Sequence, residues 1–282
     1  MAYPEYLPRQ TLYHYTSIDG LSAIAKSKCL RFSDLAAAND PREIHLGREK
    51  MFVALRSVLD ETYKSVGGQN LLNLITQMIE YFGTVQIFCC CLSLLDDSLP
   101  MWNAYGANYS GVSIGFRPRA MLDSIGRIQK VRYLDPSKKD EFRAFALDIA
   151  AQIQNPAEIA RYIDAGTSVI TAATALKHNT WSYENEVRLV FVQRRERSTG
   201  QLPDVKYALW SEPLERTVNG QSVRYFDFPF GLSKNGIHDA KRSIEHIVIG
   251  PKCTLSVDDI NTLLQENGFE GFTVRKSSCE IR

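Results

Sequence analysis

Acidic and basic residues alternate over a short stretch late in the chain, "WSYENEVRLVF" at residues 181–191. If residues 183–192 form a strand, the two-residue period places Glu184, Glu186 and Arg188 on one face and apolar side chains on the other. The two carboxylates then stand about 7 Å apart, beside a guanidinium that can keep one of them ionised. Such a pair can stabilise a developing positive charge. The competing interpretation is a solvated charged face, which is common on exposed strands.

A histidine flanked by tyrosines occurs near the start of the chain, in "LYHYTS" at residues 12–17. This stretch is too polar for a core strand and too aromatic for an ordinary loop. A neutral imidazole can donate one hydrogen bond and accept another, so His14 is a candidate for binding a polar ligand. The alternative is a structural histidine. Because Ser17 suits a helix N-cap, we expect the motif at a turn from a strand into a helix at residues 18–26.

Aromatic and hydroxyl residues form a third candidate group, made of Ser93, Trp102 and Tyr105. An aromatic face can hold a planar ligand ring. Trp102 and Tyr105 lie one helical turn apart, a spacing that by itself is more typical of the core. The polar neighbours Asn103 and Asn108 favour a site instead.

Three consecutive cysteines, Cys89, Cys90 and Cys91, raise the question of a metal site. Consecutive strand residues point to alternate faces, so at most two of the thiols could converge on one ion, and no CxxC pair supplies further ligands. We therefore expect reduced, buried thiols and no metal.

The elements that must position these residues indicate an α+β fold in one domain over residues 1–282, with helices crowded into the first two thirds and strands into the last third. The sequence predicts helices at 18–26, 41–63, 69–82 and 257–266, the second and third of them parted by Gly67 and Gly68. A further helix starts near Ser98 and Pro100, and two helices between 136 and 177 part near Asn155 and Pro156. Strands are predicted at 85–93, 112–116, 128–134, 186–192, 222–228, 244–250 and 271–276.

Composition sets broad limits on the function. The chain has 282 residues, 44% of them hydrophobic, and a formal net charge of +1. The residues can form a sizeable core, and no overall field would attract nucleic acid or an anionic membrane. No long apolar stretch predicts secretion or membrane spanning, so we expect a cytoplasmic protein without membrane contact. The absence of GxGxxG, P-loop, GxSxG and HExxH motifs argues against the commonest dinucleotide, nucleotide-hydrolysing, serine-hydrolase and zinc-protease sites.

Five ordered motifs resemble one bacterial family. They are "LYHYTSIDGLSAIAKSKCLRFS", "NDPREI", "MWNAYGANYSGVSIGF", "WSYENEVRLVF" and "IVIGPKC", which run from about Leu12 to about Lys252. Together they resemble the family known as domain of unknown function 2971.

That family is similar to the ADP-ribosyltransferase superfold, which implies a split β-sheet core with helical insertions and NAD as co-substrate. In that superfold an opening "LYH-x-T" strand, matched by His14 and Thr16, holds the adenosine ribose, and Tyr15 or Tyr13 would pack beneath the base. A late glutamate, matched by Glu186, binds the nicotinamide ribose, and Glu184 takes the leading place of an E-x-E pair. The resemblance implies a diphosphate contact for Arg31 and leaves the nicotinamide side open between Ser93, Trp102 and Tyr105. No metal is implied.

The resemblance implies an enzyme that transfers ADP-ribose from NAD to a protein, DNA or RNA, acting as a bacterial toxin or anti-phage defence effector with a regulatory or antitoxin partner. Hydrolysis of NAD is the form of this activity without an acceptor. A non-catalytic module that binds a nucleotide or a partner protein is the main alternative. A phosphate-removing relative that acts on RNA is a third, against which the acidic pair Glu184 and Glu186 counts, because RNA phosphates prefer basic surroundings.

Overall fold

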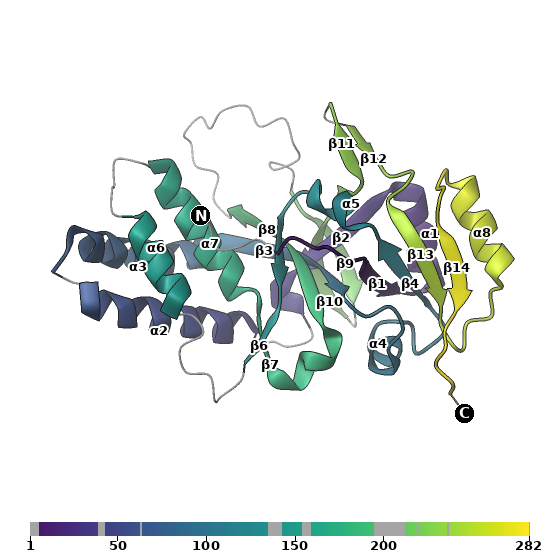
Figure 1. Ribbon diagram of the computed structural model, residues 1–282, viewed down its shortest axis with the longest axis horizontal. Helices are drawn as coiled ribbons and strands as arrows, with labels where there is room; N and C mark the ends of the chain where they lie inside the picture. Colours follow the sequence, from purple (N-terminus) through teal and green to yellow (C-terminus); the bar gives the residue numbers. More distant parts are fainter. Residues whose placement is uncertain are drawn as a thin grey trace.

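A mixed β-sheet forms the centre of the computed structural model, which describes residues 6–38, 43–62, 64–134, 143–153, 159–194, 212–218, 220–235 and 237–281. Eight strands follow the order β14-β13-β4-β1-β3-β2-β10-β9, while β8 pairs with β3 and β5 pairs with β8 (Figure 1). The strands of this sheet are β1 (Leu12–Thr16), β2 (Cys29–Asp34), β3 (Val85–Ser93), β4 (Val112–Phe116), β5 (Arg127–Lys130), β8 (Glu186–Arg194), β9 (Leu214–Val218), β10 (Gln221–Pro229), β13 (Ile244–Ile249) and β14 (Thr273–Lys276).

The sheet is split beside β3. One edge of β3 pairs with β8 along its whole length, from Val85 to Ser93. The other edge is shared: Tyr13 of β1 pairs with Ser93 at one end, and Ser33 of β2 pairs with Cys89 further along. β1 and β2 therefore diverge from each other, and the part of β3 around Cys91 lies in the gap between them.

The two larger hydrophobic cores of the described residues lie on either side of this arrangement. The first is made by the sheet with α1 (Ile18–Ser27) and α8 (Val257–Glu266), and the second by a cluster of four helices against β3 (Figure 1). The four helices are α2 (Glu43–Thr62), α3 (Val66–Thr84), α6 (Arg143–Gln152) and α7 (Ile159–Ala173). A large mixed sheet with added helices confirms the predicted α+β class.

The opening strand and helix form as the sequence predicts. Ser17 is the N-cap of α1, and its Oγ accepts a hydrogen bond of 3.1 Å from the backbone N–H of Gly20. The helix ends at Lys28, which adopts the left-handed conformation with φ of 58°. These caps fix where the chain turns from β1 into α1 and where it leaves α1.

The alternating run at 186–192 is confirmed as a strand, but its extension back to residue 183, which would place Glu184 and Glu186 on one face, was wrong. Residues 179–184 form the 3₁₀ turn η2 (Asn179–Glu184), Asn185 is left-handed with φ of 44°, and β8 begins at Glu186. Asparagine tolerates this backbone region, so the chain can turn there and then enter the sheet. Glu184 and Glu186 are therefore not neighbours along one strand face.

Other boundaries also differ from the sequence prediction. Gly67 and Gly68 do not separate two helices but lie in the first turn of α3, where Ser65 is the N-cap. The predicted helix ending at Lys177 gives way to the short strand β7 (Leu176–His178), which pairs in parallel with β6 (Arg132–Leu134). The break predicted near Asn155 and Pro156 falls in residues 154–158, which lie outside the described residues. The predicted start of the first of these helices, at Pro136, falls in residues 135–142, which also lie outside them.

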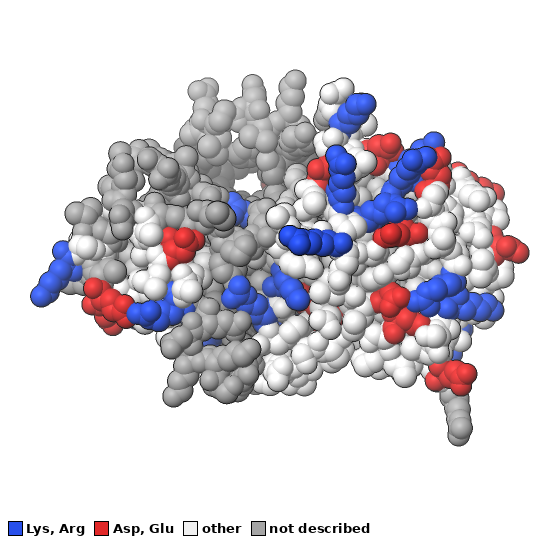
Figure 2. Space-filling view, viewed as in Figure 1, with Lys and Arg blue, Asp and Glu red and all other residues white. Residues whose placement is uncertain are grey.

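The remaining elements are short. They are α4 (Leu99–Ala104), α5 (Pro118–Leu122), the 3₁₀ turn η1 (Leu35–Ala37), and the hairpin of β11 (Leu232–Lys234) and β12 (Ile237–Asp239). Within the described ranges, no helix has the length and apolar character that crossing a membrane requires. On the face drawn in Figure 2, acidic and basic side chains of the described residues are interspersed.

Candidate active site

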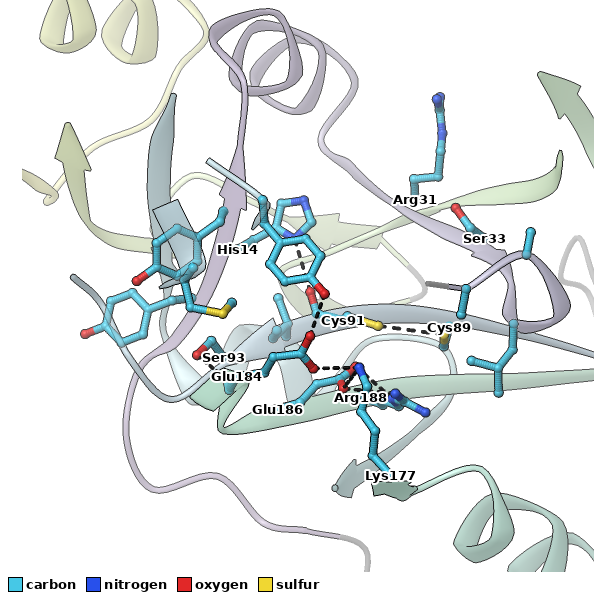
Figure 3. A pocket seen from close by; sticks show the side chains of 18 of the residues that line it. His14, Arg31, Ser33, Cys89, Cys91, Ser93, Lys177, Glu184, Glu186 and Arg188 are labelled. Carbon is cyan, nitrogen blue, oxygen red and sulfur yellow. Dashed lines mark hydrogen bonds and ion pairs between the residues drawn. The ribbon is translucent and has the colours of Figure 1, made fainter. Parts of the chain in front are cut away.

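A cavity of about 310 Å³ lies at the gap between β1 and β2. Its walls come from β1, β2, β3, α4, β7, β8 and β9, so segments far apart in the sequence meet there (Figure 3). The site residues predicted from the sequence that line it are His14, Tyr15, Arg31, Ser93, Tyr105, Glu184 and Glu186. The structure thus brings most of the predicted residues together.

Two acidic and two basic side chains form a buried cluster at the cavity. Lys177 Nζ lies 2.6 Å from Glu184 Oε2 and 3.2 Å from Glu186 Oε2, so one ammonium group bridges both carboxylates (Figure 3). Arg188 completes the cluster by pairing with Glu186. Glu184, Glu186 and Arg188 are only 2%, 4% and 1% exposed, which contradicts the interpretation of a solvated charged face.

Glu186 is held as a carboxylate. Arg188 binds it with two hydrogen bonds, from Nε to Oε1 at 2.7 Å and from Nη2 to Oε2 at 2.9 Å, and donates to the Thr174 carbonyl at 2.5 Å. Burial would raise the pKa of Glu186, but the charge and hydrogen bonds of Arg188, with the charge of Lys177, outweigh burial and lower it. The predicted pairing of a guanidinium with one carboxylate is confirmed.

Glu184 has a different environment. Its Oε1 accepts a hydrogen bond of 2.5 Å from the Tyr105 hydroxyl, and its backbone carbonyl accepts one of 2.6 Å from Ser93 Oγ. Burial, and then the charge of Glu186, raise its pKa above the ordinary value, while the hydrogen bonds from Lys177 and Tyr105 oppose this shift. The cavity therefore holds one carboxylate that stays ionised and one that takes up a proton more readily.

His14 lies on the β1 side of the gap. Its Nδ1 is 3.2 Å from the backbone carbonyl of Cys91, which can only accept, so Nδ1 carries the proton. Burial lowers the pKa of His14, which favours the neutral ring. Nε2 is then an acceptor in a side chain that lines the cavity.

Only some of the aromatic candidates line the cavity. Trp102 is fully buried and does not line the cavity: its indole N–H donates to Asp97 at 2.7 Å, and its ring packs edge-on against Tyr15 at 4.8 Å. Tyr105, one turn later, lines the cavity. Tyr15 contributes to the wall while its hydroxyl donates to the Leu95 carbonyl at 3.0 Å. Thr16 pairs with Val112 in the sheet and is not part of the lining.

Arg31 lines the outer part of the cavity, but its guanidinium is already bound by an acidic and an aromatic side chain. Its Nε and Nη2 each donate to Asp227 at 2.9 Å, and its guanidinium lies 3.9 Å from the centre of the Tyr225 ring. Both partners come from β10, the strand that pairs with β2.

The cysteine run follows the strand period. Cys89 and Cys91 share the cavity side, with their sulfur atoms 3.8 Å apart, and Cys90 packs in the first core. Cys91 is exposed in the cavity, so the prediction that all three thiols are buried was wrong for this residue. The hydrogen bond with Cys89 raises the pKa of Cys91, so its thiol keeps its proton. Among the described residues, no three His, Cys, Asp or Glu side chains form a metal-ligating group.

Sequence reasoning missed Lys177, the residue that joins the two carboxylates. It was predicted to end a helix, and a three-residue strand leaves no periodic signal that could identify it. Asn39 and Asp40, in the "NDPREI" motif, lie outside the described residues, and α2 begins at Glu43.

Comparison with known proteins identifies a family model that matches part of the chain. The model of the family described as "Protein of unknown function (DUF2971)" matches residues 101–189. The matched segment contains Tyr105, Lys177, Glu184 and Glu186, but not His14, and it is shorter than the resemblance predicted from the sequence. No curated protein and no solved structure matches the chain.

Proposed function

We propose that the chain is an NAD-consuming enzyme that transfers ADP-ribose to a macromolecule or, without an acceptor, to water. The observation that carries this proposal is the cavity at the split in the sheet. His14 lies on the β1 side of the split, and Glu184 and Glu186 lie next to the other edge of β3. A polar site at the divergence of two strands is also what the resemblance to the ADP-ribosyltransferase superfold implies.

The lining residues suit a nucleotide sugar. A volume of about 310 Å³ is at the lower end of the usual range for ligand pockets, about 300 to 1,000 Å³, and matches one ribose with its base better than a whole dinucleotide. His14 Nε2 can accept a hydrogen bond from a ribose hydroxyl, and the Tyr105 ring offers a flat surface for nicotinamide. The remainder of NAD would extend along the open side of the cavity.

The carboxylates supply complementary chemistry. In the proposed reaction, the bond between the ribose anomeric carbon and the nicotinamide nitrogen breaks, the electron pair stays on nitrogen, and neutral nicotinamide leaves. The permanent charge of Glu186 stabilises the cationic sugar that develops. An oxygen or nitrogen atom of the acceptor, or a water oxygen, then bonds to the carbon and gives its proton to Glu184, whose raised pKa suits a base.

A second candidate is a nucleotide-binding module without catalysis, and one observation favours it. Two hydrogen bonds from Arg188 and one from Lys177 reach the Glu186 carboxylate, which is only 4% exposed. A carboxylate offers about four acceptor positions, so little room remains for a ribose hydroxyl. The enzyme proposal therefore requires Glu186 to act mainly through its charge.

The test compares the wild type with Glu186→Gln and Glu184→Gln. Pure protein is incubated with labelled NAD, alone and with cell lysate, and free nicotinamide and labelled protein, DNA and RNA are measured. Glu186→Gln should lower turnover about 100-fold or more while NAD still binds. Glu184→Gln should reduce transfer more than hydrolysis. Expression of the wild type should arrest bacterial growth, and Glu186→Gln should relieve the arrest.

The control is Glu270→Gln, which removes a surface carboxylate paired with Lys241 and Arg242. Melting temperatures of all variants must be compared, because Glu186→Gln removes the buried carboxylate that Arg188 binds with two hydrogen bonds. A wild-type protein that binds NAD but neither consumes it nor labels any macromolecule would leave the binding module as the function.

A further inference from the structure

Three cationic side chains surround the outer part of the cavity. Arg31 of β2, Arg216 of β9 and Arg224 of β10 lie on adjacent strands, and the first two line the cavity directly. We call the group of Arg31, Ser33 and Arg216 the cavity mouth. Figure 3 shows Arg31 and Ser33 together, apart from the cluster of Glu184, Glu186 and Lys177.

Two of these cations are neutralised by acidic neighbours. Arg31 forms a bidentate pair with Asp227. Arg224 lies 3.5 Å from Asp34, the acidic residue that lines the cavity at this end. Asp34 is further occupied by the side chain of Gln86 at 3.2 Å and the backbone N–H of Ala36 at 3.0 Å. Neither Asp227 nor Asp34 therefore remains to balance a third cation.

Arg216 is that third cation. In the described part of the chain, no carboxylate lies within 4.0 Å of its guanidinium, whose contacts are a long hydrogen bond of 3.4 Å to Ser33 Oγ and the Tyr225 ring at 5.9 Å. Arg216 is exposed at the cavity mouth. Most of its N–H donors are thus directed to no acceptor within the described residues.

The inner end of the cavity has no such excess. Lys177 and Arg188 balance Glu184 and Glu186 when both carboxylates are ionised. Counting the groups at both ends, the surplus positive charge of the cavity is that of Arg216. A ligand that fits this distribution has a neutral or cationic sugar end inside and an anionic group at the mouth, and arginine is well suited to phosphate oxygens.

We propose that Arg216 binds a phosphate group of the nucleotide substrate at the cavity mouth. This inference deepens the proposed function and rests on the cavity being a nucleotide site. It also changes the expectation for Arg31, because the guanidinium already bound to Asp227 serves to hold Tyr225 and the strand in place. The freer Arg216 makes the phosphate contact.

The test measures the binding of ADP and of adenosine to the wild type, Arg216→Gln and Arg216→Lys by calorimetry. Arg216→Gln should weaken ADP binding about 10- to 100-fold, the range for losing a hydrogen bond to a charged group. Adenosine binding should stay unchanged, and Arg216→Lys should restore part of the ADP affinity. The matched control is Arg242→Gln, since Arg242 is an exposed arginine outside the cavity lining and pairs with Glu270.

Several results would overturn the proposal. These are unchanged ADP affinity in Arg216→Gln, an equal loss for ADP and adenosine, or no ADP binding by the wild type at millimolar concentration. A short single-stranded oligonucleotide serves as a further probe, and an Arg216→Gln effect on the oligonucleotide but not on ADP would also overturn it.

The experiments distinguish failure of the phosphate site from failure of the proposed enzyme activity. If ADP binding depends on Arg216 and NAD is never consumed, the phosphate site stands and the enzyme proposal fails. If NAD is consumed and Arg216→Gln leaves KM unchanged, the enzyme proposal stands and the phosphate site fails.

Discussion

Replacing Lys177 by Met tests whether one ammonium group keeps the carboxylate pair of the cavity ionised. Lys177 contacts Glu184 at 2.6 Å and Glu186 at 3.2 Å, with 6% of its side chain exposed. Met retains the apolar stem but removes the charge, so Glu184 loses the ammonium that it contacts while Glu186 keeps the guanidinium of Arg188. We expect the variant to respond by binding a proton at Glu184, whose pKa is already raised by burial and by Glu186.

Proton uptake by Glu184 limits the stability that Lys177→Met loses and makes this loss depend on pH. At pH 7, protonating a carboxyl group with an ordinary pKa of 4.5 costs about 1.36 kcal/mol for each of about 2.5 pH units, or about 3.4 kcal/mol. This agrees with the loss of about 3 to 5 kcal/mol for breaking a buried ion pair. At pH 5 the same protonation costs only about 0.7 kcal/mol.

The direction of this pH dependence follows from the linkage between proton binding and folding. A carboxyl group whose pKa is raised in the folded state stabilises that state below the unfolded pKa, and this stability is lost as pH rises through the folded pKa. Removing Lys177 raises the folded pKa of Glu184 further. The free energy of unfolding of Lys177→Met, relative to the wild type, should therefore recover by about 2.7 kcal/mol between pH 7 and pH 5.

Urea denaturation at pH 5, 6 and 7, followed by tryptophan fluorescence, measures this difference. The control is Lys241→Met, which removes a surface ion pair of 2.8 Å to Glu270. Because exposed ion pairs contribute little to stability, this variant should unfold at nearly the same urea concentration as the wild type at all three pH values. A Lys177→Met loss of equal size at pH 5 and pH 7 would refute the reasoning, because it would mean that no carboxyl group takes up the missing charge.

Two further predictions concern His14 and Asp97. His14→Ala should weaken NAD binding by about 1 to 3 kcal/mol in calorimetry, and a collapse of the melting temperature would instead indicate a structural histidine. Asp97 accepts hydrogen bonds from Trp102, Ser277 and Ser278, which outweigh burial and lower its pKa. Asp97→Asn should therefore lower the free energy of unfolding by about 1.5 to 3 kcal/mol for each charged hydrogen bond lost. Because the stability from a depressed pKa is lost as pH falls through the folded value, the difference should shrink below about pH 4. Unchanged stability and tryptophan emission would contradict this role.

The sequence predicts those parts of the site that depend on a local period. The alternation along β3 places Cys89 and Cys91 on one side, and the alternation after Glu186 brings Arg188 to the same carboxylate. The helix after "LYHYTS" follows from the N-cap preference of Ser17, which acts within one turn. These signals are local, so they need no knowledge of the tertiary fold.

Other parts of the site depend on contacts between distant segments. A helical spacing relates Trp102 to Tyr105, but the choice of which ring faces the cavity is made by Asp97, which anchors the Trp102 indole. The position of Lys177 depends on pairing between β6 and β7. The surplus charge of Arg216 depends on which arginines pair with carboxylates in the folded chain. These pairs join distant segments, since Asp227 is 196 positions from its partner Arg31.

The short strand β7 links the core of the four-helix cluster to the cavity. Leu176 belongs to the core of the four-helix cluster, and the next residue, Lys177, bridges the carboxylates of the cavity. Any opening of the helical cluster that frees Leu176 must also withdraw the ammonium from the site. Because a ligand stabilises only the state that binds it, occupation of the cavity should make local unfolding of those helices rarer. The helices thus share a cooperative unit with a site to whose lining none of their described residues belongs.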